Sequence, residues 1–248
     1  MASIFAEYRL IPDLTFKTTL NLDNTDNDSK SFTPYQVTNA LATRQKDLTI
    51  RSSGAFTSYK KVTFVNENTL SYNKTINSVH DISALAGFSY NSDKFDNQRI
   101  ASNGGYSRDN VITLNAANGF TGETREERNV LLSYFGRVQY SFDGKYMFSA
   151  SMRRDGSSRF GSNTQWGWFP SASVGWRVSD EDFMRSIAFI NDLKLRASWG
   201  KAGNYNIGNY SSISTLGSYN YSLNGAAALG QASARIANPD LTWEKSET

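Results

Sequence analysis

The residue types that most often carry catalysis are scarce in this sequence. Among its 248 residues there is a single histidine, His80, and there is no cysteine. A Ser-His-Asp triad would need a nucleophile within hydrogen-bond reach of His80, and no motif places one there. A histidine-based metal site would need further histidine ligands, and thiol catalysis or a disulfide would need cysteine. We therefore expect no enzyme, no catalytic residue and no cofactor.

One stretch carries the oxygen atoms that Ca²⁺ prefers. The segment DNTDNDSKSF, residues 23–32, places Asp, Asn and Ser side chains at alternating positions. It fails the EF-hand pattern, because Asp28 stands where that loop needs Gly and Pro34 stands where it needs Glu. The prediction is a solvated loop without a dedicated metal site, and an incidental Ca²⁺ site is the alternative.

A second stretch gathers charge that could contact a substrate. RRDGSSRFG, residues 153–161, contains Arg153, Arg154, Asp155 and Arg159 around an Asp-Gly turn signal. The arginines could equally pair with neighbouring carboxylates or with lipid headgroup phosphates. Arg154 and Arg159 are therefore candidate substrate-binding residues, with a structural role as the alternative.

A third stretch is rich in tyrosine. In GNYNIGNYSSISTLGSYNYSLNG, residues 203–225, tyrosines alternate with Asn and Ser. Aromatic rings stack on the apolar faces of sugars, and Asn side chains both donate and accept hydrogen bonds. A glycan-contacting loop needs these properties, although many surface loops share them. The candidate substrate-binding tyrosines are Tyr205, Tyr210, Tyr219 and Tyr221.

Charge and hydropathy exclude several classes of protein. The chain has 26 Lys and Arg against 23 Asp and Glu, a net charge of +3, and no basic run longer than a pair. A nucleic-acid-binding protein usually concentrates its basic residues in one stripe, so we expect no nucleic-acid partner. No apolar run approaches the ~18 residues of a membrane helix. The first ten residues lack the basic and apolar regions of a signal peptide.

Period-two alternation of apolar and polar residues recurs along the chain, whereas helical periodicity is almost absent. The alternation predicts nine strands, the last one partial, at residues 4–10, 14–22, 69–76, 82–90, 130–142, 146–153, 170–179, 193–199 and 241–248.

Short and long connections take turns between these strands. Residues 11–13, 77–80 and 143–145 are short, whereas 23–66, 91–127, 156–167 and 202–239 are long and rich in Asn, Gly and Ser. The connection 179–191 belongs to the short side but is longer. Ser179 is a plausible N-cap there, with Asp182 three residues later, so we predict one short helix near 180–187.

Short turns at one end and long loops at the other are typical of an outer-membrane β-barrel. Lipid contacts one face of each strand and water the other, which explains a mean hydropathy of −0.51 in a membrane protein. The predicted strands are longer than the five or six residues usual in a soluble β-sandwich, the alternative interpretation. The alternation assigns lipid-facing positions to Val138, Tyr140, Phe148, Val174, Trp176, Leu195 and Trp199. It assigns lumen-facing positions to Lys17, Arg137, Arg177, Lys194 and Arg196.

Several longer segments resemble a known family. These are ENTLSYNKTINSVHDISALAGFSY from residue 67, LLSYFGRVQYSFDGKYMFSASMRRDGSSRFG from 131, WGWFPSASVGWRVSDEDFM from 166, LKLRASWGKAGNYNIGNY from 193 and NPDLTWEKSET from 238. Together they resemble the C-terminal half of the barrel in the SusC/RagA family of TonB-linked outer-membrane transporters. The resemblance is weak in 23–65 and 91–127.

The resemblance implies a fold, a location and a class of activity. Relatives are barrels of about 22 strands around an N-terminal plug. They import oligosaccharides or peptides with energy relayed by TonB, and a SusD-type lipoprotein caps them. Residues 1–248 would then be one part of the barrel domain, without the plug and the remaining strands, and inactive alone. The expected partners are a SusD-like lipoprotein, the TonB complex, outer-membrane lipid and a glycan or peptide substrate, with a glycan preferred.

Two alternatives remain open at this point. A siderophore-type TonB-dependent receptor shares the same architecture. A surface adhesin or a soluble carbohydrate-binding β-domain would also contain alternating strands and tyrosine-rich loops.

Overall fold

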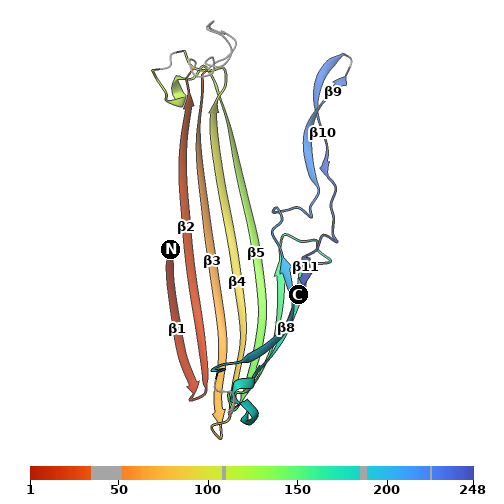
Figure 1. Ribbon diagram of the computed structural model, residues 1–248. Coiled ribbons are helices and arrows are strands. Elements are labelled where there is room, and N and C mark those ends of the chain that lie inside the picture. The colour runs from red at the N-terminus through yellow and green to blue at the C-terminus, as the bar shows by residue number, and fades with distance from the viewer. Residues whose placement is uncertain (35–51, 108–109, 185–188, 224) are drawn as a thin grey trace. The chain divides into compact units, whose positions relative to one another are not determined.

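The computed structural model describes residues 1–34, 52–107, 110–184, 189–223 and 225–248, and most of them lie in long strands. Nine strands form one sheet in the order β1-β2-β3-β4-β5-β6-β7-β8-β11 (Figure 1). The prediction of an all-β, antiparallel sheet of nine strands is confirmed. The strands of this sheet are β1 (Ala2–Ile11), β2 (Leu14–Thr33), β3 (Ser53–Ile76), β4 (His80–Ser102), β5 (Phe120–Phe142), β6 (Tyr146–Ser157), β7 (Trp166–Arg177), β8 (Lys194–Asn204) and β11 (Glu244–Glu247).

Tight turns join the strands at the short-connection end. Between β5 and β6, Asp143 and Gly144 have φ values of 53° and 65°, and the Lys145 amide donates to the Phe142 carbonyl at 2.9 Å. Between β3 and β4, Asn77 and Ser78 have φ values of 52° and 59°. Two successive residues with positive φ match the twist of the flanking strands, as in type I′ hairpins. These turns fix the register, and therefore the face, of every side chain that follows.

Strands β2 to β5 are much longer than the sequence predicted. They contain 20, 24, 23 and 23 residues, so much of 23–66 and 91–127 is strand and not loop. The segment 23–32, interpreted as a solvated loop, lies within β2. Both faces of these extensions carry polar side chains, which removes the alternation that marks a strand with one apolar face.

The chain divides into two compact units. One contains residues 1–2, 22–64 and 93–128, which include these polar extensions. Within it, Asp93 accepts a 2.6 Å hydrogen bond from the Thr63 hydroxyl and lies 3.5 Å from the Lys61 ammonium. The other unit contains residues 3–21, 65–92 and 129–248, and it holds all the candidate site residues.

The remaining elements are small. A separate antiparallel hairpin, β9 (Thr215–Leu223) and β10 (Ala226–Arg235), occupies part of the expected loop 202–239. The expected helix near 180–187 is present as two single 3₁₀ turns, η2 (Val178–Asp180) and η3 (Asp182–Met184), and residues 185–188 lie outside the described residues. A further 3₁₀ turn, η1 (Leu114–Ala116), lies between β4 and β5. No helix in the described part of the chain is long and apolar enough to cross a membrane.

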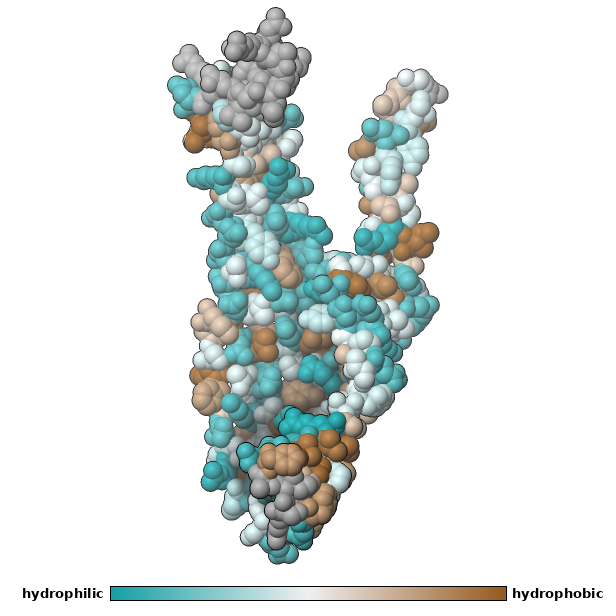
Figure 2. Space-filling model, viewed as in Figure 1, coloured by the Kyte–Doolittle hydropathy of each residue, from teal (hydrophilic) through white to brown (hydrophobic). Residues whose placement is uncertain are grey.

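Hydrophobic side chains are mostly exposed. Within the described ranges, the buried ones are Phe160, Phe169, Val178 and Trp243. Figure 2 shows hydrophobic and hydrophilic residues side by side on the surface. A sheet with so little core has faces that must be covered by something other than this chain's own side chains.

Candidate functional site

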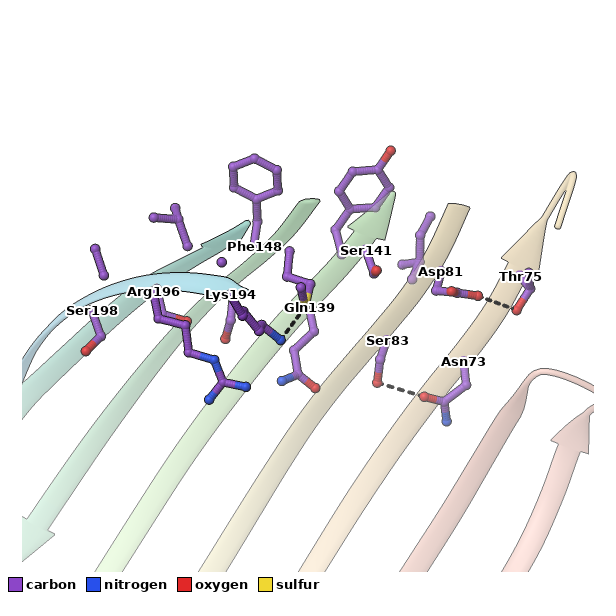
Figure 3. A pocket seen from close by; sticks show the side chains of 18 of the residues that line it. Asn73, Thr75, Asp81, Ser83, Gln139, Ser141, Phe148, Lys194, Arg196 and Ser198 are labelled. Carbon is purple, nitrogen blue, oxygen red and sulfur yellow. Dashed lines mark hydrogen bonds between the residues drawn. The ribbon is translucent and has the colours of Figure 1, made fainter. Parts of the chain in front are cut away.

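One face of the sheet in the second unit carries polar side chains around an open hollow of about 700 Å³. Figure 3 shows Lys194 and Arg196 of β8, Gln139 of β5 and Ser83 of β4 on one side of the strands, with Phe148 pointing to the other side. Ser83 donates a 2.7 Å hydrogen bond to the Asn73 side chain on the neighbouring strand. The lining therefore includes hydroxyl, amide and cationic groups, together with Asp81 and the apolar side chains of Ile82 and Met147.

The register of β5 to β8 explains this gathering. Gln139, Ser149, Ser173 and Ser198 pair in succession across the four strands. Residues paired across a sheet project from the same face, and residues two apart along a strand share it. The next row toward the tight turns ends in Arg196, and the row toward the other end begins with Arg137. The alternation in the sequence predicted which cations lie on this face. The same alternation also places the neutral residues Gln139, Ser149 and Ser173 there.

The cations of this face differ in their partners. Arg177 pairs with Lys194 across the strands, and its guanidinium lies 3.7 Å from Asp180 and 3.7 Å from Asp192. The Lys194 ammonium donates to the Met147 sulfur at 2.9 Å. Arg137 and Arg196 have no carboxylate partner within the described residues. Two guanidinium groups thus remain available to a ligand or to another part of the protein.

Lys17 belongs to the strands at the other edge of the sheet. Its ammonium lies 4.9 Å from the centre of the Phe5 ring, a cation–π contact between β2 and β1. Lys17 is not among the residues that line the hollow. The structure therefore does not bring it together with Lys194 and Arg196.

The opposite face of β5 to β8 is apolar, and the seven residues predicted to face lipid all lie on it. They occupy three rows, which are Val138-Ala150-Ala172-Trp199, Tyr140-Phe148-Val174-Ala197 and Phe142-Tyr146-Trp176-Leu195. Val138, Phe148, Val174 and Leu195 are half exposed or more. Toward the long-connection end, the same face also carries Arg154 on β6 and Lys201 on β8.

Aromatic residues and a carboxylate close the tight-turn end of the apolar face. Glu181 in the 3₁₀ region accepts a 2.5 Å hydrogen bond from the Tyr146 hydroxyl and a 3.0 Å hydrogen bond from the Trp176 indole. These two donors, the Tyr146 hydroxyl first, lower the pKa of the Glu181 carboxyl below its ordinary value. The polar ends of Tyr146 and Trp176 therefore point toward the turn, as expected for residues at a membrane boundary.

Arg159 and Tyr205, both predicted to bind substrate, contact each other and neighbouring loops. Arg159 donates to the Asn209 side chain at 2.9 Å and to the Tyr205 carbonyl at 3.3 Å, and it also packs over the Tyr205 ring. Tyr205 packs in turn against Trp243, which is 4% exposed in the small hydrophobic cluster with Phe160 and Phe169. These contacts join loops that are far apart in the sequence.

The other predicted tyrosines are exposed. Tyr219 and Tyr221 project from the same face of β9, each 46% exposed. A Cβ on Gly230 would overlap the Tyr221 ring, and a Cβ on Gly217 would lie 3.0 Å from the Tyr219 ring. The two rings thus lie over glycines of the hairpin, with one face of each open. Tyr210 lies in a turn with φ 58°, and its carbonyl accepts from Arg235.

Arg154 projects from the apolar face, in the row Tyr134-Arg154-Trp168. Its guanidinium carbon lies 4.5 Å from the Trp166 ring centre and 5.1 Å from the Trp168 ring centre. Its neighbour Arg153 lies on the other face, where it donates two 2.8 Å hydrogen bonds to Asp155 and one to the Ser133 hydroxyl. The Trp residues around Arg154 were visible in the sequence, but their contact with it was not predicted.

No group of three or more His, Asp or Glu residues that could hold a metal ion exists in the described part of the chain. The Asp and Asn residues of 23–32 lie along β2, where alternate side chains point to opposite faces of the strand. His80 contacts the Tyr140 hydroxyl at 2.8 Å through Nδ1.

Comparison with known proteins assigns these features to a family. The family described as TonB dependent receptor-like, beta-barrel matches residues 3–248, which is nearly the whole chain. The chain belongs to this family. Its sheet is therefore part of an outer-membrane β-barrel, as the resemblance to the SusC/RagA transporters implied.

Individual relatives support the same assignment. TonB-dependent receptor P39 of Formosa agariphila is 36% identical over 97% of this chain, and TonB-dependent receptor SusC of Bacteroides thetaiotaomicron is 39% identical over 49% of it. The solved structure entitled "Structure of the RagAB peptide transporter" superposes with a TM-score of 0.80 at 30% identity and covers 98% of this chain. The chain spans 22% of the P39 receptor, 12% of SusC and 26% of the RagAB chain.

Proposed function

We propose that this chain forms part of the wall and the outer loops of a TonB-dependent importer of oligomeric nutrients in the outer membrane. The observation that carries the proposal is the division of β5 to β8 into apolar rows on one face and polar rows around a hollow on the other. A channel wall needs this division, because one face meets lipid and the other meets water and substrate. A soluble β-domain would bury its apolar face.

The division gives each face a role. The three apolar rows, which end in Trp199, Ala197 and Leu195, face lipid. Arg137, Arg177, Lys194 and Arg196 face the lumen, and Lys17 lines a different part of the same wall. The short-turn end then faces the periplasm, and the long-connection end faces outward, where the β9–β10 hairpin lies.

We propose an oligosaccharide as the substrate, and the hairpin supports this choice. Tyr219 and Tyr221 offer two neighbouring ring faces on one strand, and sugar rings stack on such faces. Successive same-face residues of a strand are about 6.7 Å apart, which suits contacts with consecutive units of a chain-like ligand. A peptide is the second candidate, because the RagAB structure that superposes on 98% of this chain is entitled a peptide transporter.

The proposal includes two partners outside this chain. A SusD-like lipoprotein would cover the outer end, where the tyrosine-bearing hairpin could meet substrate beneath it. The TonB complex would supply energy through a part of the protein other than these strands. The similarity to SusC and to the RagAB assembly supports both partners.

The test is uptake by cells that carry the full-length gene, its deletion or defined variants. Replacing Tyr219 and Tyr221 by Ala should lower uptake of one oligosaccharide by roughly thirtyfold if each ring contributes about 1 kcal/mol of stacking. The matched control replaces Ser218 and Asn220 by Ala, because these residues lie on the other face of the same strand. The control should retain uptake.

Three outcomes would redirect the assignment. Loss of peptide uptake with intact oligosaccharide uptake would support the peptide candidate. Loss of iron-chelate uptake alone would indicate a siderophore receptor. Equal losses in the tyrosine and control variants would show that the hairpin acts through its fold and not through its rings.

A further inference from the structure

Arg154 is a cation at the border of the apolar rows, and, unlike Lys201 on the same face, it has no carboxylate partner within the described residues. It shares this face with Met152 and Ala150 on its own strand, and β5 and β7 flank it on either side. The neighbouring strands that could supply a partner are therefore present. Yet its Nε is buried without a hydrogen-bond acceptor within the described residues, and its guanidinium packs against two tryptophan rings. A partly buried guanidinium with an unpaired buried Nε favours an anionic partner.

The tryptophans place the guanidinium at one border of the apolar rows. Arg154 and Trp168 pair across β6 and β7, and Tyr146 and Trp176 pair eight residues away. Eight residues correspond to roughly 20 Å of height in a strand tilted by about 45°, which is close to the apolar band of a membrane barrel. Arg154 thus lies at the level of one layer of lipid headgroups. The layer at the tight-turn end lies beside Tyr146.

An apolar furrow leads away from Arg154 along the same face. A hollow of about 510 Å³ lies between Tyr134, Met152 and the two tryptophans, with the small residues Ala86 and Gly136 among its lining. A second hollow of about 560 Å³ shares Ala86, Gly136 and Met152 with the first. Leu70, Ala84, Val138 and Ala150 also line the second hollow. Because the side chains on β4, β5 and β6 are small there, the apolar furrow continues from Arg154 along this face.

We propose that Arg154, Trp166 and Trp168 bind the phosphate group of a membrane lipid whose acyl chain lies in this furrow. The guanidinium offers a planar set of donors that matches two phosphate oxygens. The Trp166 and Trp168 rings contact the guanidinium and position it next to the furrow. The occupant has one anionic end and one apolar end, as the site does. The inference rests on the proposed assignment of this face to lipid, and it goes beyond the transport function.

The experiment measures lipid binding to the purified full-length transporter by native mass spectrometry. The probes are lipid A carrying its phosphates and the same lipid A after enzymatic dephosphorylation. The wild type should bind the phosphorylated form about tenfold more tightly, because only this form offers phosphate oxygens to the guanidinium. Arg154→Gln should abolish this preference, and Arg154→Lys should retain part of it.

Two further variants distinguish the contribution of the phosphate contact from the contribution of the furrow. Gly136→Leu should weaken binding of both lipid forms, because it fills the furrow. A Cβ there meets only the Leu85 carbonyl, at 3.6 Å, so the fold can accept it. Arg196→Gln removes a guanidinium from the opposite face, at a position that does not line the furrow, and should leave the preference unchanged. The heat-dependent gel shift of the folded barrel confirms folding of each variant.

The proposal is overturned if the wild type binds both forms of lipid A equally, or if Arg154→Gln keeps the preference. Competition by inorganic phosphate at equal strength would indicate a site for free anions and would also overturn it. Lipid binding is measured without nutrient, whereas the importer assignment is tested by uptake. A negative result for lipid binding therefore leaves the importer assignment untouched.

Discussion

Similar side chains have different contacts on the two faces of β5 to β8. Arg153 and Arg154 are adjacent in the sequence and project from opposite faces. Arg153 is tied to Asp155 and Ser133 by three hydrogen bonds, whereas Arg154 is held only by tryptophan rings. The polar face therefore satisfies its charges with protein groups or water. On the apolar face, Lys201 pairs with Glu247, whereas Arg154 lies at the border of the apolar rows, where lipid headgroups would lie.

The contacts of an arginine in this sheet therefore depend on the face from which it projects, and not on its residue type alone. Serine recurs along one polar row of the sheet, and Phe148 and Val174 occupy the neighbouring apolar row. A one-residue shift in register would exchange the two sets. The tight turns at Asp143-Gly144 and Asn77-Ser78 prevent this shift.

The largest expected effect comes from placing a charge in the middle of the apolar rows. Val174→Arg should lower the free energy of unfolding of the full-length barrel in bilayers by about 2–4 kcal/mol. Ser173→Arg, one residue away, should cost little, because Ser173 shares the polar face with Gln139 and Ser149. Unfolding in denaturant measures both variants. Equal losses would mean that the two faces are not different environments.

A smaller effect should separate the two adjacent arginines. Arg153→Gln leaves Asp155 and Ser133 without their donor, and these residues are 7% and 1% exposed. Its cost should be about 1–3 kcal/mol, the penalty for an unsatisfied buried polar group. Arg154→Gln removes only cation–π contacts and should cost about 0.5–1 kcal/mol. If Arg154→Gln is the more destabilising variant, then Arg154 stabilises the fold through contacts other than the two tryptophan rings.

The smallest effect concerns pH at the tight-turn end. The hydrogen bonds from Tyr146 and Trp176 lower the pKa of Glu181 below 4.5 in the folded protein. The stabilisation is therefore fully present above the ordinary carboxyl pKa and is lost as pH falls through the lowered value. The wild type should lose slightly more stability than Glu181→Gln between about pH 5 and pH 3. Parallel pH profiles for the two proteins would show that Glu181 does not contribute to the pH dependence of stability.

The sequence predicted the sheet well where one face is apolar. The alternation around Val138, Phe148 and Val174 identified the strands, and the register places these residues in shared rows. It failed in β2 to β5 beyond the apolar segments, because residues such as Lys61 and Asp93 face polar surroundings on both sides. Period-two alternation carries no signal there, and only pairing with neighbouring strands reveals the extension.

The candidate site was less predictable than the sheet. Tyr205 and Tyr219 occur in the same tyrosine-rich stretch, yet Tyr205 packs against Trp243 while Tyr219 lies exposed on the hairpin. The contact of Arg159 with residues near 205–209 spans about fifty positions in the sequence. Local composition cannot distinguish these outcomes, because they depend on which distant loop each side chain meets.

Cysteine labelling tests the central claim most directly. This chain has no cysteine, so single cysteines can be introduced at Ser173 and Val174 in a full-length protein without other accessible thiols. The account predicts that a small water-soluble maleimide labels Ser173→Cys in intact outer membranes and leaves Val174→Cys unlabelled, while both react after denaturation. Rapid labelling of Val174→Cys together with protection of Ser173→Cys would contradict the assignment of the two faces and, with it, the proposed channel wall.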